Sequence, residues 1–357
     1  MATTKPIVAI CYDFDGTLSP KNMQEYGFFL GLEQKERKTF WKESNGLAKE
    51  KGADQNLMYM KKMIDKAKLP GSNLKTTRSA FQEYGKTIDF YPGVKDWFSR
   101  INQYGRKHGV TVKHYIISSG LKEMVEGSEI GKCFTKIYAC TFLYDTNDVA
   151  EWPAQVVNCT SKTQYLFRIN KGIEDDSDTV RLNEYVKHEN RPVPFSRMIY
   201  VGDGTTDIPC MRLVKEQGGF AIGVYKSKSN KSKQVADKLF ADGRVNFIAP
   251  ADYTDNSIFD QLIKRIIDRI QYAYELEKYG KKCVPRNEKK NADIRNCDFQ
   301  TLVNETHSTE TSVTDTTMPK NGGCNGTCEV PKTGCDAEAA TSKGGDEAAD
   351  SKSSASR

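Results

Sequence analysis

Two aspartates that lie one residue apart could do chemistry that a lone acid cannot. Asp13 and Asp15 follow an apolar run, residues 7–12, and are themselves followed by glycine and threonine. Residues two apart in a strand point to the same side, so both carboxylates would meet at the end of the run. Like charges this close raise each other's pKa, so a cation must hold the pair or one member must stay protonated. A carboxylate in such a site can attack phosphorus if a metal ion and a lysine offset the repulsion between the anions.

A hydroxyl group that such a reaction could use follows a second apolar run. Residues 111–117 lead directly into Ser118, Ser119 and a glycine. A serine in this place can bind a phosphate oxygen together with backbone amides at the start of the next helix. The structural alternative is that Ser118 simply caps that helix.

Lys162 is the best candidate for the lysine that such a reaction needs, because it lies at the start of a predicted helix over residues 161–171. Leu166 and Ile169 have the spacing of a buried helical face, which favours this helix. An ammonium group on its first turn could point toward the same place as the serine. Lys171, on the same predicted helix, is the alternative.

Further acid follows a third apolar run, residues 198–201. The sequence continues Gly-Asp-Gly-Thr-Thr-Asp, which places Asp203 at the strand end and Asp207 one turn later. Oxygen ligands of this kind suit a hard cation, with Asp203 as the ligand and Asp207 as the residue that orients the site. Gly-Asp-Gly is also common in turns, so this segment is informative only together with the others.

Taken in order, these four segments resemble the four signature motifs of the haloacid dehalogenase superfamily of hydrolases. The resemblance covers roughly residues 6–250. The second acid, Asp15, is similar to the phosphatase and phosphomutase members, whereas the dehalogenases lack it and the P-type ATPases carry a threonine there. The Ile-Ser-Ser-Gly form of the second motif and a predicted strand pair within residues 136–159 resemble the branch that contains phosphoserine phosphatases.

The resemblance implies a Mg²⁺-dependent phosphatase that hydrolyses a small-molecule phosphomonoester through an aspartyl-phosphate. Asp13 would be the nucleophile, and Asp15 would protonate the leaving group and then activate water. The residues implied to bind the phosphoryl group are Ser118, Ser119 and Lys162. The residues implied to bind Mg²⁺ are Asp13, Asp15 through its backbone carbonyl, and Asp203, with Asp207 as support.

Two other functions are compatible with these motifs. A phosphomutase or phosphotransferase of the same superfamily would pass the phosphoryl group to another hydroxyl, and a non-catalytic binding protein would keep only the fold. The substrate class stays open: phosphoserine phosphatases carry a glutamate after the first motif that binds the substrate's ammonium, and neither Asn22 nor Glu25 aligns with it. The expected partner is a small phosphate ester, with no nucleic acid, no membrane and an open oligomeric state.

The hydrophobic pattern predicts an α/β fold, a doubly wound and Rossmann-like parallel sheet with the site beyond the carboxyl ends of its strands. The predicted strands cover residues 7–12, 111–117, 198–201, 220–224 and 245–249, and a long helix is predicted over 257–279. The predicted parts are a catalytic core over residues 1–19 and 91–282, an inserted helical cap over 20–90, and a low-complexity, disordered tail over 283–357.

The charge of residues 20–90 and the cysteines of the chain lead to two further predictions, one on substrate binding and one on location. Residues 20–90 hold fourteen Lys or Arg against nine Asp or Glu, in a chain with a net charge of +6. This segment could steer an anionic substrate toward the site, or it could be an ordinary solvated surface. The ten cysteines occur without an evident signal peptide or an apolar stretch long enough to cross a membrane, which favours a reducing cytoplasm.

Overall fold

The central feature of the protein is a seven-stranded sheet, seen in the computed structural model, which describes residues 5–283. The strands lie in the order β4-β3-β2-β1-β5-β6-β7, and all neighbours are parallel except β3 and β4. Their bounds are β1 Ile7–Tyr12, β2 Thr111–Leu121, β3 Lys136–Tyr144, β4 Ala150–Gln155, β5 Met198–Gly202, β6 Phe220–Tyr225 and β7 Phe247–Pro250. The predicted tail lies outside the described residues from position 284 onward.

Strand β1 lies at the centre of the sheet, and its continuous apolar sequence suits a strand that is covered on both faces. It pairs with β2 on one side and with β5 on the other, so that Tyr12 lies opposite Ile116 and Val201. Parallel strands in this register end at the same edge of the sheet. The segments that follow β1, β2 and β5 therefore meet there, at the usual ligand edge of such a sheet.

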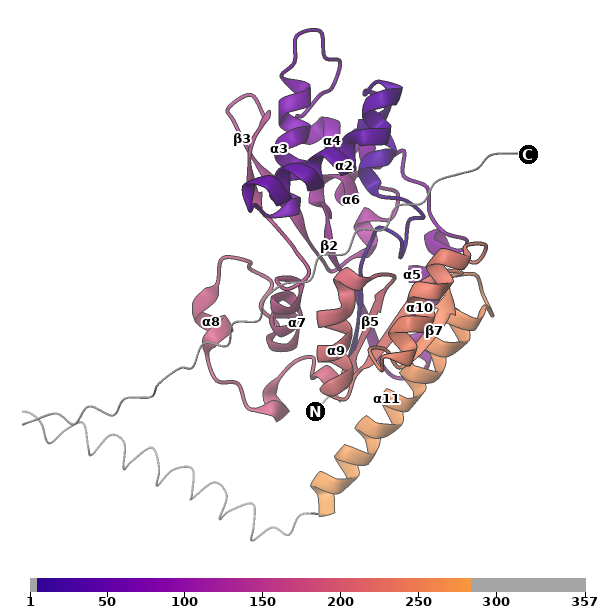
Figure 1. The fold of residues 1–357 in the computed structure, drawn as a ribbon. Coiled ribbons are helices and arrows are strands. Elements are labelled where there is room, and N and C mark those ends of the chain that lie inside the picture. Colours follow the sequence, from indigo (N-terminus) through magenta and orange to yellow (C-terminus); the bar gives the residue numbers. More distant parts are fainter. Residues whose placement is uncertain (1–4, 284–357) are drawn as a thin grey trace, which may run out of the picture. The chain divides into compact units, whose positions relative to one another are not determined.

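Helices cover both faces of the sheet, as right-handed connections between parallel strands require. Figure 1 shows α7 and α9 on one side of the strands and α5 and α11 on the other. The α-helices of the core are α5 Val94–Lys107, α6 Lys122–Gly127, α7 Lys162–Lys171, α8 Thr179–Asn183, α9 Ile208–Glu216, α10 Asn230–Ala241 and α11 Ile258–Cys283. Short 3₁₀ helices are η1 Met23–Glu25, η2 Gly131–Cys133, η3 His188–Asn190, η4 Phe195–Arg197 and η5 Thr205–Asp207.

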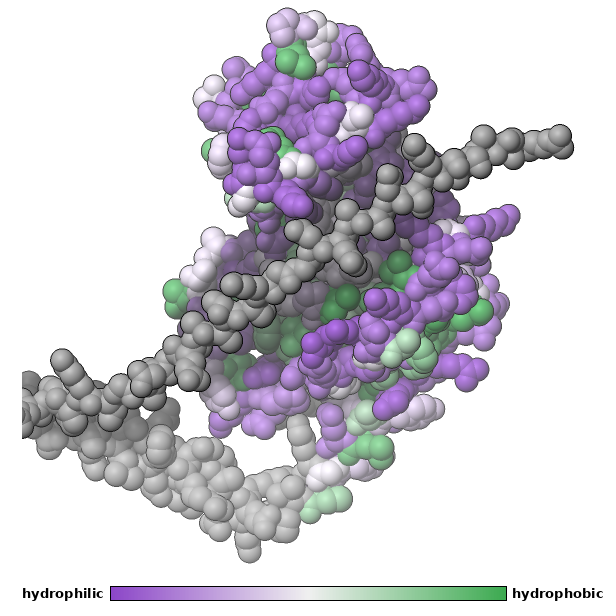
Figure 2. Space-filling view, viewed as in Figure 1, coloured by the Kyte–Doolittle hydropathy of each residue, from purple (hydrophilic) through white to green (hydrophobic). Residues whose placement is uncertain are grey.

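A helical segment separates β1 from α5 and lies above the carboxyl edge of the sheet (Figure 1). Its α-helices are α1 Gly27–Leu30, α2 Gln34–Lys51, α3 Gln55–Ala67 and α4 Arg78–Gly85. Its helices pack around an aromatic cluster, which consists of Phe29, Phe40, Trp41 and Tyr59. The face of this segment shown in Figure 2 is mostly hydrophilic.

The β3–β4 hairpin binds to this helical segment. The backbone N–H of Ala150 donates to the carbonyl of Thr76 at 2.8 Å, and that of Arg78 donates to the carbonyl of Asp148 at 3.2 Å. Strand β4 also packs against α3. Core and helical segment are thus joined by backbone hydrogen bonds as well as by the chain itself.

Most predicted elements are confirmed, with changes at their ends. The strands over residues 7–12, 198–201 and 220–224 are present, and the predicted strand pair is the β3–β4 hairpin, whose first strand also continues the main sheet. Strand β2 is longer than predicted because it includes the Ser-Ser-Gly segment, and α11 continues to Cys283, the first residue of the predicted tail. The division into core and cap remains a prediction. In residues 5–283, no helix is long and apolar enough to cross a lipid bilayer.

Candidate active site

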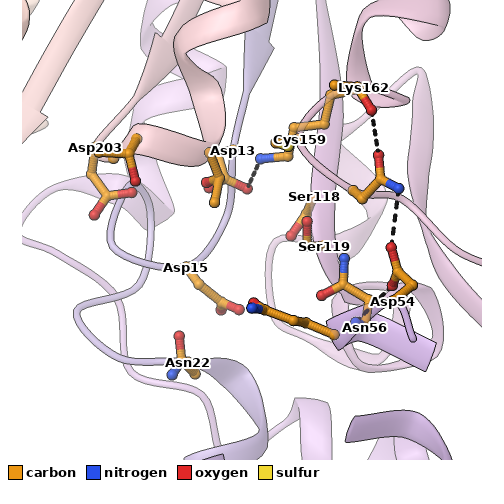
Figure 3. Close-up of a pocket in the computed structure, with 16 residues that line it drawn as sticks. Asp13, Asp15, Asn22, Asp54, Asn56, Ser118, Ser119, Cys159, Lys162 and Asp203 are labelled. Carbon is orange, nitrogen blue, oxygen red and sulfur yellow. Dashed lines mark hydrogen bonds and ion pairs between the residues drawn. The ribbon is translucent and has the colours of Figure 1, made fainter. Parts of the chain in front are cut away.

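A cavity of about 620 Å³ opens at the carboxyl edge of the sheet, and we call it the strand-end cavity. It brings together six of the predicted site residues, Asp13, Asp15, Ser118, Ser119, Lys162 and Asp203. Its other lining residues are Asn22, Asp54, Gln55, Asn56, Asn158, Cys159, Thr160, Gly204, Thr205 and Thr206. Figure 3 shows Lys162 reaching the carboxylate of Asp13, with Asp15 and Asp203 beside them. Asp207 lies behind this group and is fully buried.

The loop after β1 fixes the two predicted catalytic aspartates. The backbone N–H of Asp13 continues the sheet by donating to the carbonyl of Val201 at 2.9 Å. The chain then turns at Gly16, whose φ of +76° lies in the left-handed region that glycine adopts readily. One carboxylate oxygen of Asp15 accepts a hydrogen bond of 2.9 Å from the backbone N–H of Met23, which holds this side chain in the cavity.

Lys162 is fully buried and lies between two carboxylates. Its Nζ is 3.1 Å from Asp13 Oδ1 and 2.7 Å from Asp207 Oδ1. The hydroxyl of Tyr200 donates to the same Asp207 oxygen at 2.8 Å. Asp207 thus holds the lysine in place. The alternative, Lys171, donates instead to backbone carbonyls at the far end of α7 and does not line the cavity.

Burial and mutual repulsion change the protonation of the acids. Burial, together with the nearby Asp207 charge, raises the pKa of Asp13 to about 6, although Lys162 opposes this shift. Burial and the neighbouring Asp13 raise the pKa of Asp15 well above its ordinary value, and burial and Asp207 do the same for Asp203. Burial alone would lower the pKa of Lys162, but Asp13 and Asp207 raise it, so the lysine is charged. A cluster with more acids than bases is suited to a cation.

The acid cluster fits a hard cation. Oxygens of Asp13, Asp203 and Asp207 lie within 4.8 Å of one another. Asp207 already accepts hydrogen bonds from Lys162 and Tyr200, so Asp13 and Asp203 have the oxygens best placed to bind a metal ion. A Cβ at Gly16 would lie 2.2 Å from Asp203 Oδ2, which shows how closely the first loop approaches this carboxylate. Carboxylate oxygens of this kind are the ligands that Mg²⁺ and Ca²⁺ prefer.

The two serines lie at the end of β2. Ser118 Oγ accepts a hydrogen bond of 3.0 Å from the backbone N–H of Gly120, which leaves its own hydroxyl proton free to donate. Helix α6 begins after Leu121 and has no side-chain cap, so Ser118 does not cap that helix. The backbone carbonyl of Ser119 accepts a 2.8 Å hydrogen bond from the hydroxyl of Tyr59 on α3.

Residues from the helical segment also line the strand-end cavity, and the sequence motifs do not include them. Asp54 caps α3 through the backbone N–H groups of Asn56 and Leu57, and its other oxygen accepts a 3.1 Å hydrogen bond from Asn158. The side chain of Asn56 donates to the carbonyl of Val157 at 3.0 Å. The only available signal was that Asp54 precedes a predicted helix, as capping residues do. The partners of these residues depend on tertiary packing.

The Lys and Arg residues of 20–90 lie outside the strand-end cavity, and steering of an anionic substrate by their charge remains a prediction. None of the Lys or Arg residues in 20–90 lines the strand-end cavity, and Lys162 is the only cationic side chain that does so in the described part of the chain. Several of these basic side chains form ion pairs with acids of the same segment, such as Lys62 with Glu43 and Lys66 with Glu36. Direct contact between these charges and a ligand in the cavity is therefore not part of this site.

An uncharacterized protein from Borreliella burgdorferi is 26% identical over 287 residues, which cover 73% of this chain and 96% of that protein. Similar solved structures include a haloacid dehalogenase family hydrolase from Salmonella enterica serovar Typhi, with 17% identity, a TM-score of 0.45, and coverage of 73% of this chain and 72% of that one.

Two further solved structures have similar sequence identities and TM-scores. Phosphoserine phosphatase, as a phospho-aspartyl intermediate analogue, has 14% identity and a TM-score of 0.44, with 73% of this chain and 99% of that chain covered. Cytosolic 5′-nucleotidase IIIB bound to cytidine has 14% identity and a TM-score of 0.43, with 76% and 87% covered. The family model for haloacid dehalogenase-like hydrolase matches residues 10–212, which is more than half of the chain. This chain therefore belongs to the haloacid dehalogenase-like hydrolase family.

Proposed function

We propose that the protein is a Mg²⁺-dependent phosphatase that hydrolyses a small-molecule phosphomonoester through an aspartyl-phosphate on Asp13. The observation that carries the proposal is the geometry around Asp13. Its carboxylate lies 3.1 Å from the buried Lys162 and in one cavity with Asp15, Ser118 and Asp203. This arrangement provides a nucleophile, a proton donor and phosphate-binding groups at one point.

In the first half of the reaction, a carboxylate oxygen of Asp13 attacks phosphorus while the bond to the leaving-group oxygen breaks. The ammonium of Lys162 and the free hydroxyl proton of Ser118 bind phosphoryl oxygens. Asp15 transfers its proton to the leaving oxygen, and its raised pKa fits a carboxyl that begins the reaction protonated. Mg²⁺, held by Asp13, the Asp15 backbone carbonyl and Asp203, would neutralise negative charge on the reacting groups.

In the second half, water removes the phosphoryl group from Asp13. Asp15, now ionised, accepts a proton from this water while the water oxygen attacks phosphorus. The bond from phosphorus to Asp13 breaks, which restores the Asp13 carboxylate and releases inorganic phosphate. Asp15 is protonated again and ready for the next ester.

The test is phosphate release from an aryl phosphate and from a panel of metabolite phosphates, with Mg²⁺ or EDTA. The proposal expects activity that needs both Mg²⁺ and Asp13, so Asp13→Asn should be inactive. Asp237→Asn is the matched control, because it makes the same chemical change in an exposed carboxylate on α10 that pairs with Lys233. Equal loss in both variants, or activity that survives Asp13→Asn, would contradict the proposal. Transfer of phosphate to an added sugar phosphate instead of water would identify a phosphotransferase or phosphomutase.

A further inference from the structure

A second cavity, of about 300 Å³, adjoins the strand-end cavity, and we call it the cap-side cavity. The two share Asp15 and Ser119 from the core, together with three amide side chains, Asn22, Gln55 and Asn56. The cap-side cavity is completed by Gln24, Trp41, Asn45 and Tyr59. If Asp13 attacks phosphorus and Asp15 protonates the leaving oxygen, the rest of the leaving group extends past Asp15 into this second cavity.

The lining of the cap-side cavity carries almost no charge. Among residues 5–283, no Lys, Arg or His lines it, and Asp15 is the only carboxylate that does. Five of its nine lining residues are amides, Asn22, Gln24, Asn45, Gln55 and Asn56. Each amide offers both donors and an acceptor, which suits hydroxyl groups. A carboxylate or a second phosphate on the leaving group would lose its water there without gaining a cationic partner.

Gln24 gives this cavity an unused hydrogen-bond acceptor. The residue is only 2% exposed, and its Oε1 has no hydrogen-bond partner among the described residues. A buried acceptor without a partner costs about 1–3 kcal/mol. A ligand hydroxyl that donates to Gln24 Oε1 would remove this cost.

Glu25 supports the cavity wall and does not line the cavity. Its Oε1 accepts hydrogen bonds from Asn22 Nδ2 at 2.9 Å and from Trp41 Nε1 at 3.2 Å. Trp41 also packs edge-on against Tyr59, with ring centroids 5.6 Å apart. The wall therefore presents an aromatic surface beside amide groups. Such a surface is suited to the C–H and O–H groups of a polyol, whereas a substrate ammonium would find Glu25 already engaged.

We infer that the leaving group of the substrate is an uncharged, polyhydroxylated molecule of the sugar or polyol class, bound in the cap-side cavity. This inference rests on the proposed phosphatase function. The size of the cavity agrees with it, because 300 Å³ is the share of about ten water molecules, which is close to one hexose or hexitol. Amino-acid, amino-alcohol and carboxylated phosphate esters are the charged alternatives.

The first experiment compares kcat/KM for matched esters: a hexitol phosphate, a hexose phosphate, phosphoserine, phosphocholine and phosphoglycerate. We expect the two neutral esters to exceed the three charged ones by about 100-fold. Equal or better use of any charged ester would overturn the inference while leaving the phosphatase proposal intact. Gln24→Met, which keeps the side-chain length but removes the acceptor, should lower kcat/KM for the hexitol phosphate more than kcat/KM for an aryl phosphate, which has no hydroxyl to donate; an equal change for both esters would overturn the role of Gln24.

A charge placed in the cavity gives a second, independent test. Asn45 lies on the exposed side of α2, so Asn45→Lys should fold, and the new ammonium should improve phosphoglycerate relative to hexitol phosphate by about 5-fold. Gly46→Lys is the matched control, because it adds the same charge at the next position, where a side chain meets nothing within 4 Å. If both variants change the ratio equally, the cap-side cavity does not bind the leaving group.

Binding to the inactive Asp13→Asn protein separates the two proposals. Calorimetry with Mg²⁺ should show tighter binding of the hexitol phosphate than of phosphoserine. Such binding, if the wild-type protein releases phosphate from no ester, would show that the cap-side cavity prefers a neutral polyhydroxylated ligand, but it would refute the phosphatase function and with it the assignment of that ligand as a leaving group. Phosphate release from charged esters, together with weak binding of neutral ones, would support the phosphatase function and refute the cap-side inference.

Discussion

The two cavities that meet at Asp15 are built from different chemistry. The strand-end cavity combines four carboxylates, those of Asp13, Asp15, Asp54 and Asp203, with one buried ammonium group, while the cap-side cavity is lined mainly by amides and aromatic rings. Charged groups at the strand-end cavity shift one another's pKa, whereas the cap-side cavity has hydrogen-bonding groups without a cation. In our account, the first cavity breaks the ester bond and the second selects the ester. Variants in the two cavities should therefore fail in different ways.

Asp15→Asn should separate the roles of the two cavities most strongly, because it should lower turnover without changing ester preference. Loss of a general acid and base should lower turnover of an alkyl phosphate by about 10²–10⁴-fold. An aryl ester, whose leaving group needs no proton, should be affected less in the first half of the reaction. The order of preference among alkyl esters should stay unchanged, because the amides of the cap-side cavity remain. Single-turnover kinetics with both ester types would measure this, and near-normal turnover of alkyl esters would refute the assigned role.

Within the acid cluster, Asp203 and Asp207 should also respond differently to substitution, because we assign Asp203 to the metal ion and Asp207 to Lys162. Asp203→Asn should raise the Mg²⁺ concentration needed for half-maximal activity by about 10–100-fold or more. In EDTA, the same variant should raise the melting temperature at pH 7.5, because it removes a buried anion from a repelling group. Asp207→Asn should instead lower it, because it takes a partner from the buried Lys162, and loss of one partner of a buried ion pair costs about 3–5 kcal/mol.

Melting curves in EDTA and in Mg²⁺ distinguish these two roles. If both variants shift the melting temperature in the same direction in EDTA, the assignment of one acid to the metal ion and the other to the lysine is wrong. An unchanged Mg²⁺ titration for Asp203→Asn would place the metal ligand elsewhere.

The pH dependence of metal binding follows from the shifted pKa of Asp13. This carboxyl has a pKa of about 6, and its protonated form does not bind a cation. Apparent affinity for Mg²⁺ should thus fall by at least about 10-fold for each pH unit below this value, and more steeply where Asp203, whose pKa burial also raises, is protonated as well. A Mg²⁺ titration of the melting temperature between pH 5 and 8 would measure the change. Constant affinity down to pH 5 would show that Asp13 is not a ligand or that its pKa is not raised.

The smallest effect is expected where the helical segment meets the core. Asn158→Ala removes the hydrogen bond to Asp54 at the start of α3 and the two that its Oδ1 accepts from Thr160 and Ser161 just before α7, which together are worth about 1–3 kcal/mol. Stability should fall by this amount, with a change in kcat/KM of only a few-fold for alkyl esters. Asn183→Ala on α8, which loses an exposed bond to the carbonyl of Thr179, is the control. A large loss of aryl ester hydrolysis in Asn158→Ala would mean that this contact organises the strand-end cavity as well.

The sequence predicted the strand-end cavity well because its residues follow strands. The runs before Asp13, Ser118 and Asp203 are apolar and buried, and parallel strands bring their carboxyl ends together in any sheet of this class. Lys162 could be placed on a helix, but only the structure distinguishes it from Lys171, because the choice depends on the contact with Asp207.

The cap-side cavity could not be predicted in the same way. Its amides come from the loop before η1 and from three helices, η1, α2 and α3, and isolated Asn and Gln residues on helices are usually solvent-exposed surface residues. Their convergence depends on how α2 and α3 pack over the end of β2, which follows from tertiary contacts such as that of Tyr59 with Ser119. The net charge of residues 20–90 left substrate steering and an ordinary solvated surface as alternatives, and neither cavity is lined by one of these basic side chains.

The most direct test of the central claim is to trap the phosphoryl group on the protein. The protein would be mixed with a hydrolysable ester and Mg²⁺, quenched in acid within one turnover, digested and analysed by mass spectrometry. Our account predicts phosphate on the peptide that contains Asp13, at the Asp13 carboxylate, and none in EDTA or in Asp13→Asn. Phosphate on another residue, or ester hydrolysis at full rate by Asp13→Asn, would contradict it.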